Sequence, residues 1–251
     1  MAKKTINSLL QFDLDSMLGR SWLVGIDEAG RGALAGPVCA GAVAVSAKLY
    51  KNQKCIDFLS ELNDSKKLTE STRETLYKKL EELKNLGFID FEAGYASVEE
   101  IETQNILVAT QLAMARACTA LNERLSLNLR SAGSVATLFG ERALDVSLAD
   151  VLIDGKPMKK FPYAHRAVVK GDASSLAIAA ASIVAKVSRD RLMKNLAIDY
   201  PRYAFEIHKG YGTAIHLQTL MLYGASEVHR KSFLRKIRGE TISSDSQGEL
   251  F

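Results

Sequence analysis

The sequence predicts an α/β domain in which a central mixed sheet is flanked by helices and followed by a helical C-terminal region. Short apolar runs of strand length alternate with longer segments of helical periodicity along the 251 residues. The last third of the chain is helical in pattern almost throughout. We therefore expect a lead-in helix over residues 1–21, one folded domain over 22–238 and a flexible tail over 239–251.

The first half of the chain supplies three predicted strands and two predicted helices. Residues 22–27 and 37–46 are apolar and are separated by a glycine-rich turn, a pattern typical of a hairpin. Residues 87–95 alternate between two faces, as a third strand does. Helices are expected over 69–84 and 98–125. The predicted buried face of the second helix comprises Ile101, Ile106, Leu107, Leu112, Met114 and Leu121.

The second half adds two short strands and then turns helical. Residues 151–154 and 167–169 are apolar runs of strand length. A long helix is expected over 173–199, and two more over 213–223 and 226–237. The remaining connections are predicted to be a polar loop and an irregular segment with a short helix, over residues 63–68 and 126–150.

The composition is that of an ordinary globular protein, with 47% hydrophobic and 25% charged residues. The formal net charge of +4 permits a polyanionic partner without requiring one. The three cysteines, Cys39, Cys55 and Cys118, have neither the spacing of zinc ligands nor that of a disulfide framework. No secretory signal or run long enough to cross a bilayer is visible, so we expect a cytoplasmic protein that does not associate with membranes.

Acidic residues stand at or just after the ends of three predicted strands. Asp27 and Glu28 end the first strand, Asp154 ends the strand 151–154, and Asp172 follows the next. If these strands are neighbours in one sheet, four carboxylates converge and repel one another unless they bind cations. Oxygen ligands favour Mg²⁺ or Mn²⁺. Two such ions about 3.5–4 Å apart would stabilise the attacking and leaving oxygens of a phosphodiester displacement.

Each of these acids also has an ordinary structural explanation. Asp172 precedes a helix and could be its N-cap, and Asp154 followed by glycine could be a plain turn. Asp27 and Glu28 are adjacent, so their side chains point to opposite faces unless the strand ends or twists there. Glu28 is therefore the weaker ligand candidate. The repetition of the pattern at three strands favours the metal site over three separate coincidences.

Several motifs in series extend this pattern. They are Asp27-Glu28-Ala29-Gly30-Arg31-Gly32, Asp64-Ser65-Lys66-Lys67-Leu68, Ile153-Asp154-Gly155, Val169-Lys170-Gly171-Asp172-Ala173 and His208-Lys209-Gly210-Tyr211-Gly212-Thr213. In order and spacing they resemble those of bacterial ribonuclease HII, over about residues 22–235. The resemblance implies a ribonuclease H-like fold.

The same resemblance implies a metal-dependent endoribonuclease with a role in ribonucleotide excision repair. Its substrates would be RNA–DNA hybrids and single ribonucleotides embedded in duplex DNA. Cleavage would proceed by two-metal-ion hydrolysis with Mn²⁺ or Mg²⁺, on the 5′ side of the ribonucleotide, and would leave 3′-hydroxyl and 5′-phosphate ends. We expect such a protein to act as a monomer.

Individual residues acquire expected roles from the resemblance. The acids matching the family's metal ligands are Asp27, Glu28, Asp154 and Asp172, with Asp27 central. Gly30, Arg31 and Gly32 match the segment whose backbone groups read the 2′-hydroxyl, which distinguishes RNA from DNA. Tyr211 matches the tyrosine that stacks on the sugar following the ribonucleotide, although a loop aromatic packed on its neighbours is the ordinary alternative.

Other charged residues are weaker candidates. Lys66, Lys67 and Lys170 could contact phosphates, but a lone lysine is usually only solvated. Arg189 and Asp190 fall in the middle of a predicted helix and are interpreted as a structural ion pair.

The C-terminal tail ends in a motif of its own. Gln247-Gly248-Glu249-Leu250-Phe251 resembles the short peptides with which bacterial proteins dock on the replication sliding clamp. A flexible tether that ends in two large apolar residues suits such docking. The sliding clamp is therefore an expected partner beside the nucleic acid.

Two other functions are compatible with the same acids. A DNA-directed nuclease of the same fold, such as a junction resolvase, would not need Gly30-Arg31-Gly32 together with Tyr211. A non-catalytic module that binds hybrids would gain nothing from four clustered carboxylates, because they repel phosphate.

Overall fold

A five-stranded mixed sheet forms the centre of the computed structural model, which describes residues 2–17, 19–58, 68–132 and 148–237. The strands are β1 (Trp22–Ala29), β2 (Val38–Ser46), β3 (Ile89–Ala96), β4 (Ala149–Asp154) and β5 (Arg166–Val168). Their order in the sheet is β3-β2-β1-β4-β5. The first three are antiparallel neighbours, whereas β1, β4 and β5 run parallel. All five predicted strands and the mixed sheet are confirmed.

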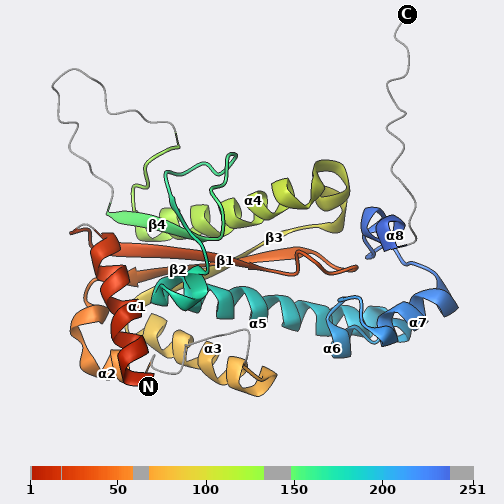
Figure 1. The fold of residues 1–251 in the computed structure, drawn as a ribbon, viewed down its shortest axis with the longest axis horizontal. Helices are drawn as coiled ribbons and strands as arrows, with labels where there is room; N and C mark the ends of the chain where they lie inside the picture. Colours follow the sequence, from red (N-terminus) through yellow and green to blue (C-terminus); the bar gives the residue numbers. More distant parts are fainter. Residues whose placement is uncertain (1, 18, 59–67, 133–147, 238–251) are drawn as a thin grey trace, which may run out of the picture.

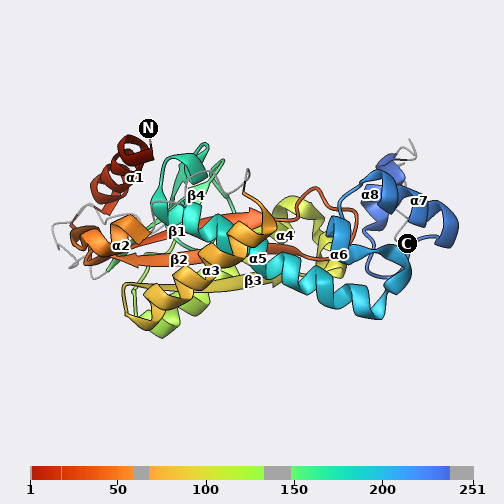
Figure 2. The same cartoon turned by 90° about the horizontal axis from the view of Figure 1, so that it is seen from below.

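Helices cover both faces of this sheet (Figure 1). On one face lies α4 (Val98–Leu125), and on the other lie α5 (Leu176–Asp199) and α3 (Glu70–Asn85). The other helical elements are α1 (Ala2–Met17), α2 (Gln53–Phe58), α6 (Phe205–His208), α7 (Ala214–Tyr223), α8 (Lys231–Ile237), and the 3₁₀ turns η1 (Leu49–Lys51), η3 (Gly171–Ala173) and η4 (Pro201–Tyr203). The elements α6, α7 and α8 gather at one end of the molecule, beyond the sheet (Figure 2).

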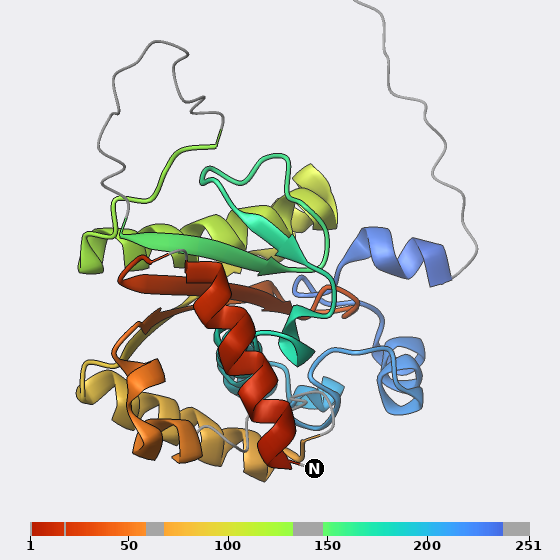
Figure 3. The same cartoon turned by 60° about the vertical axis from the view of Figure 1, so that its left-hand side comes forward.

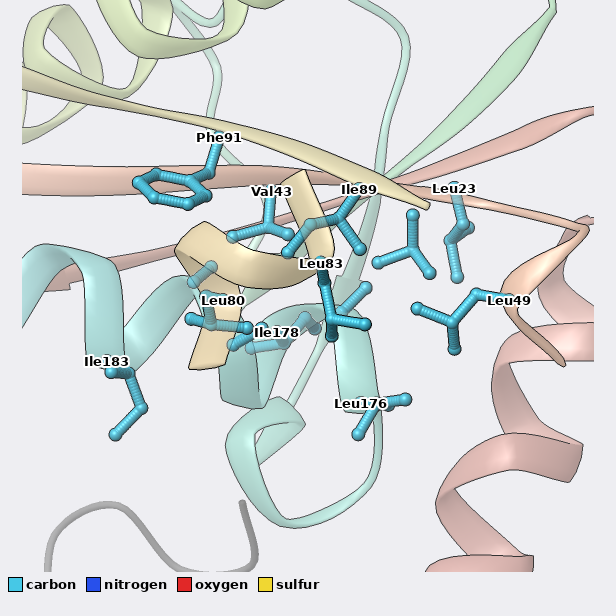
Figure 4. Close-up of a cluster of buried hydrophobic side chains, with 14 of the residues drawn as sticks. Leu23, Val43, Leu49, Leu80, Leu83, Ile89, Phe91, Leu176, Ile178 and Ile183 are labelled. Atoms are coloured by element: carbon cyan, nitrogen blue, oxygen red, sulfur yellow. The ribbon is translucent and has the colours of Figure 1, made fainter. Parts of the chain in front are cut away.

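Each face of the sheet has its own apolar core. On the α5 side, residues such as Leu23 and Val43 pack against Leu80, Leu83 and Ile178 (Figure 4). The other core, between the sheet and α4, includes Val24, Ile26, Ala113 and Met114. Residues of β1 therefore alternate between the two cores, as successive strand side chains must.

Glycines in the strands let the helices approach the sheet closely. A Cβ on Gly41 would lie 2.3 Å from the carbonyl oxygen of Ala181 in α5. One on Gly94 would lie 2.2 Å from the carbonyl oxygen of Ala113 in α4. Small residues on strand and helix thus fix the distance between the layers, which holds α5 rigidly against β1 and β2.

Helix α4 is interrupted near its start. Asn105 has φ 69° and ψ 162°, a conformation that is almost confined to glycine. Its Oδ1 accepts hydrogen bonds from the N–H groups of Leu107 (3.0 Å) and Val108 (3.2 Å), as an N-cap does. Leu107, which was predicted to be buried, is 57% exposed, because it lines a groove at the start of α4 and does not pack on the sheet.

Helix α1 lies within the N-terminal segment that was expected to be a lead-in helix, and it crosses one side of the domain (Figure 3). It is anchored by Asp13, whose Oδ2 accepts hydrogen bonds from the Tyr50 hydroxyl (2.9 Å) and the Ala177 N–H (3.0 Å). Burial of this carboxyl raises its pKa to about 6. The apolar residues Leu9, Leu10 and Met17 face the core.

The C-terminal region differs from prediction at one boundary. A helix was expected from residue 226, but α8 begins at Lys231. The preceding segment instead pairs with the loop between β1 and β2, through an isolated bridge of His229 to Ala35.

None of the helices in the described ranges is long and apolar enough to cross a membrane. Three predicted segments lie largely outside the described residues. They are the polar loop (within 59–67), the middle of the irregular connection (133–147) and the C-terminal tail (within 238–251).

Candidate active site

The parallel pairing of β1 and β4 brings two predicted acids side by side. Ile26 pairs with Ile153, so the next residue on each strand, Asp27 and Asp154, stands at the same edge of the sheet. Asp172 joins them from η3, just beyond β5. The N–H of its neighbour Gly171 donates a 2.6 Å hydrogen bond to Asp154 Oδ1. We call Asp27, Asp154 and Asp172 the carboxylate edge.

The structure excludes the ordinary explanation for Asp172 and keeps the one for Asp154. The N-cap of α5 is Ser175, whose Oγ accepts a hydrogen bond from the Ile178 N–H (3.2 Å), so Asp172 is not the cap. Asp154 does precede a turn, because Gly155 has φ 88° and donates its N–H to the Val168 carbonyl. That turn leaves the Asp154 side chain at the edge beside Gly171.

Glu28 is directed away from the other three acids. Along β1, Leu23 packs in the core beside α5, whereas Val24 and Ile26 pack in the core beside α4. By this alternation Asp27 lies on the α5 face and Glu28 on the α4 face. The Oε1 of Glu28 accepts a 2.8 Å hydrogen bond from Arg31 Nη1. Within the described part of the chain no three His, Cys, Asp or Glu side chains are grouped as metal ligands are, so the structure brings Asp27, Asp154 and Asp172 to one edge without closing a metal site around them.

A groove of about 700 Å³ borders Glu28 and Asp154 on the α4 side. Its other polar lining residues are Arg31, Asn105, Gln111, Lys156, Lys159 and Lys160. The loop after β4 is tied to α4 by a 2.7 Å hydrogen bond from the Lys160 N–H to Gln111 Oε1. Cationic side chains therefore stand beside the acids, an arrangement that suits a polyanion. Sequence reasoning missed these lysines, although they directly follow the Asp154-Gly155 motif.

The predicted glycine-rich segment forms a loop between β1 and β2, and we call residues 30–37 the glycine loop. Its two candidate glycines differ. Gly30 has φ 88°, and a Cβ there would lie 1.9 Å from Arg189 Nε. Gly32 has no atom within 4 Å of a Cβ position and no left-handed φ, and it is exposed. The fold therefore requires glycine at position 30 but leaves the space beside Gly32 open to a ligand.

Tyr211 lies next to the glycine loop. The Leu34 N–H donates a 2.8 Å hydrogen bond to the carbonyl of Gly210, which joins the two segments. The Tyr211 ring lies 5.3 Å from the Arg189 guanidinium carbon and is half-buried. His216 Nδ1 holds the Tyr211 carbonyl at 3.0 Å. The structure thus brings Tyr211 and the glycine loop together, as one recognition surface would require.

The remaining charged candidates have varied positions. Lys170 is exposed, directly before η3. Lys66 and Lys67 lie outside the described residues. The expected Arg189–Asp190 ion pair is replaced by other contacts, since Asp190 accepts a 2.6 Å hydrogen bond from Lys186 and the Arg189 guanidinium binds backbone carbonyls.

A family model for ribonuclease HII matches residues 24–236, which include the carboxylate edge, the glycine loop and Tyr211. The chain belongs to the ribonuclease HII family. A ribonuclease HII of Fusobacterium nucleatum is 48% identical over 217 residues, which cover 86% of each chain. One from Magnetococcus marinus is 43% identical over 213 residues and 84% of each chain.

Solved structures share the fold. The structure of a PCNA:RNase HII complex from Archaeoglobus fulgidus matches with a TM-score of 0.60 at 21% identity, covering 84% of this chain and 94% of that one. The ribonuclease H2 of Pyrococcus horikoshii matches with a TM-score of 0.57 at 23% identity, covering 87% of this chain and 97% of that one. These likenesses confirm the ribonuclease H-like fold.

Membership in the ribonuclease HII family establishes the activity. The protein is a metal-dependent endoribonuclease that cleaves RNA in RNA–DNA hybrids and ribonucleotides embedded in DNA. The donor set at the carboxylate edge fits a hard divalent cation, because it offers carboxylate oxygens and neither thiolate nor imidazole.

Proposed function

We propose that Asp27, Asp154 and Asp172, with Glu28 as the outlying fourth ligand, hold Mg²⁺ or Mn²⁺ in a two-metal site. The observation that supports this proposal most directly is the pairing of β1 with β4, which sets Asp27 beside Asp154 at one sheet edge. When bound, such cations activate water and neutralise charge on the scissile phosphate. A structurally similar ribonuclease HIII has been solved with Mn²⁺, at a TM-score of 0.59 and 14% identity.

The chain's own residues would position the substrate around this site. Asp27 and Asp172 are only 4% and 7% exposed, so their carboxylates are held by packing rather than free to follow the ligand. Lys156, Lys159 and Lys160 border the groove and would bind the phosphate backbone. Lys66, Lys67 and Lys170 remain weaker candidates for the same role.

Selection of the ribonucleotide would fall to the glycine loop and Tyr211. The open space beside Gly32 allows the backbone of Gly30, Arg31 and Gly32 to approach a 2′-hydroxyl closely. Tyr211 would stack on the sugar that follows. Cleavage on the 5′ side of the ribonucleotide would leave a 3′-hydroxyl and a 5′-phosphate.

The test uses duplex DNA that contains one ribonucleotide, incubated with Mg²⁺, Mn²⁺ or EDTA. We expect a single nick on the 5′ side with either cation and none with EDTA, with the ends identified by mass spectrometry. An all-DNA duplex is the matched control. Equal nicking of that control would indicate a DNA-directed nuclease, and binding without cleavage under every condition would indicate a hybrid-binding module.

We also propose that Gln247–Phe251 docks on the replication sliding clamp, a proposal that rests on the sequence alone because these residues lie outside the described part. Deleting them should abolish clamp binding in a pull-down while cleavage of a short duplex is unchanged. Clamp binding that survives the deletion would reject this role for the tail.

A further inference from the structure

The glycine loop is held by backbone partners from the C-terminal region, far away in sequence. Besides the bond from the Leu34 N–H to Gly210, the Gly36 N–H donates to the carbonyl of Val228 (2.8 Å). The N–H of Arg230 in turn donates to the carbonyl of Leu34 (2.8 Å). The position of the loop is therefore set by tertiary contacts as well as by the hairpin to which it belongs.

Two fully buried arginine side chains add to these contacts. Arg189 donates to the carbonyls of Pro37 (Nε, 3.0 Å), Ala35 (Nη2, 3.1 Å) and Lys209 (Nη1, 2.9 Å). Arg230 donates from Nε to the carbonyl of Gly36 (2.9 Å) and from Nη1 to that of Arg31 (3.0 Å). Both side chains are 0% exposed. Four of the five accepting carbonyls belong to the glycine loop, and the fifth lies two residues before Tyr211.

Stability alone does not explain this arrangement. A buried charge is costly unless a carboxylate offsets it. The hydrogen-bond acceptors of these two guanidinium groups are backbone carbonyls, which carry no opposite charge. Burial lowers the pKa of Arg230 to about 9 and also lowers that of Arg189. Nη2 of Arg230 is buried and has no hydrogen-bond partner within the described structure. Apolar side chains of similar volume would fill the same space at lower cost. Only a rigid, planar guanidinium group, however, can bind several carbonyls in fixed directions.

Arg189 also contacts both halves of the recognition surface. Its guanidinium lies over the Tyr211 ring, and its Nε occupies the position that a Cβ on Gly30 would need. It projects from α5, which close helix–strand packing holds rigidly against the sheet. A shift of this one side chain would move the glycine loop and Tyr211 relative to each other.

We propose that Arg189 and Arg230 are positioning residues that set the selectivity for a ribonucleotide, by fixing the glycine loop at a constant distance from Tyr211. The inference rests on the proposed function of that loop and of Tyr211. Neither arginine touches the substrate. By binding these carbonyls, the two arginines hold the backbone groups of Gly30–Gly32 in the position from which they can recognise a 2′-hydroxyl.

The test replaces each arginine by lysine, which keeps the charge but cannot bind several carbonyls at once. For a duplex with one ribonucleotide, we expect kcat to fall about 10- to 100-fold in Arg189→Lys and Arg230→Lys, as loss of hydrogen bonds from a charged group predicts. KM should change less than about threefold, because the phosphate backbone is bound elsewhere. Arg124→Lys is the matched control, since Arg124 pairs with Asp90 and Glu92 at the β3 edge. It should keep wild-type kcat.

A double-mutant cycle separates positioning from a general loss of stability. Adding Arg189→Lys to Tyr211→Ala should cause a much smaller further loss than Arg189→Lys causes alone, because both changes impair the same recognition step. Additive losses, or a KM effect without a kcat effect, would overturn the inference. If the wild type nicks all-DNA duplex equally well, the proposed function fails instead, whatever the variants do.

Hydrogen exchange in the wild type provides a measurement that does not depend on the folding of a variant. The amides of Leu34 and Gly36 should exchange as slowly as those in the centre of β1, because the arginines and the C-terminal region hold the loop closed. Rapid exchange of these amides, like that of an exposed loop, would show that the loop is not fixed and would overturn the inference.

Discussion

The carboxylate edge and the glycine loop lie at the same end of the sheet but are built in different ways. The carboxylate edge follows from three neighbouring parallel strands, which carry an acid near or shortly after their C-terminal ends. The glycine loop depends on Arg189 in α5 and on two segments of the C-terminal region, around Gly210 and Arg230. With the proposed roles, the metal ligands would belong to the regular sheet, whereas selectivity would depend on contacts between distant parts of the chain. Substitutions at the two regions should therefore differ in their effect on stability.

The largest expected effect is at the carboxylate edge. Asp154→Asn should reduce turnover on the order of 1000-fold, because a neutral amide is a poor ligand for a divalent cation. Substrate binding and the thermal unfolding midpoint should stay near wild type, since asparagine can still accept the hydrogen bond from Gly171. Asp150→Asn, on the same strand but paired with Arg20, is the control and should keep full turnover. Full activity of Asp154→Asn would remove this residue from the site.

Gly30 and Gly32 give a sharper comparison within the glycine loop. Gly30→Ala should lower the free energy of unfolding by about 2–4 kcal/mol and also impair cleavage, because its Cβ would displace Arg189. Gly32→Ala should leave the unfolding midpoint unchanged and reduce only cleavage of the ribonucleotide substrate, because its Cβ meets no protein atom. The unfolding midpoint and the cleavage rate of both variants, measured on the same samples, test this difference. Equal destabilisation by both substitutions would contradict the distinction.

Acid should weaken the C-terminal region, which supports Tyr211. Burial lowers the pKa of His216 and of His229 to about 4, and their Nε2 atoms lie 3.1 Å apart. The folded state therefore disfavours protonation, so its stability is complete above the unfolded pKa of about 6.5 and falls as pH drops toward 4. At pH 5 the loss should be on the order of 2 kcal/mol for each histidine.

Urea unfolding at pH 7.5 and pH 5 measures this loss. His229→Gln should make the pH dependence shallower, because one of the two groups no longer titrates. An equal stability of the wild type at both pH values would contradict the prediction.

The carboxylate edge was predictable from sequence because strand pattern and acid position are local properties. Apolar runs ending at Asp27 and Asp154 identify the strands, and parallel strands bring such ends together. The opposite direction of the Glu28 side chain also follows from alternation along a strand, which is a local property. The contacts of Arg189 were not predictable. Its partners lie at residues 35, 37 and 209, so no window of sequence contains both the guanidinium and its acceptors.

Two other departures from prediction have different origins. The interruption of α4 at Asn105 was not predicted, because nothing in the helical periodicity before or after it signals a break. The segment before α8 forms a turn and an isolated bridge to the glycine loop, although its own composition favours a helix. In this second segment a tertiary partner overrode local preference.

The contact between Gly30 and Arg189 also constrains how this protein can evolve. Any side chain at position 30 would occupy the space of the guanidinium, and any shorter residue at position 189 would release the carbonyls of the loop. We therefore expect the two positions to change together, since a substitution at either one would need a compensating substitution at the other. Lineages that relax their requirement for a ribonucleotide should be recognisable by paired substitutions at these two sites, while the acids of the carboxylate edge stay as they are.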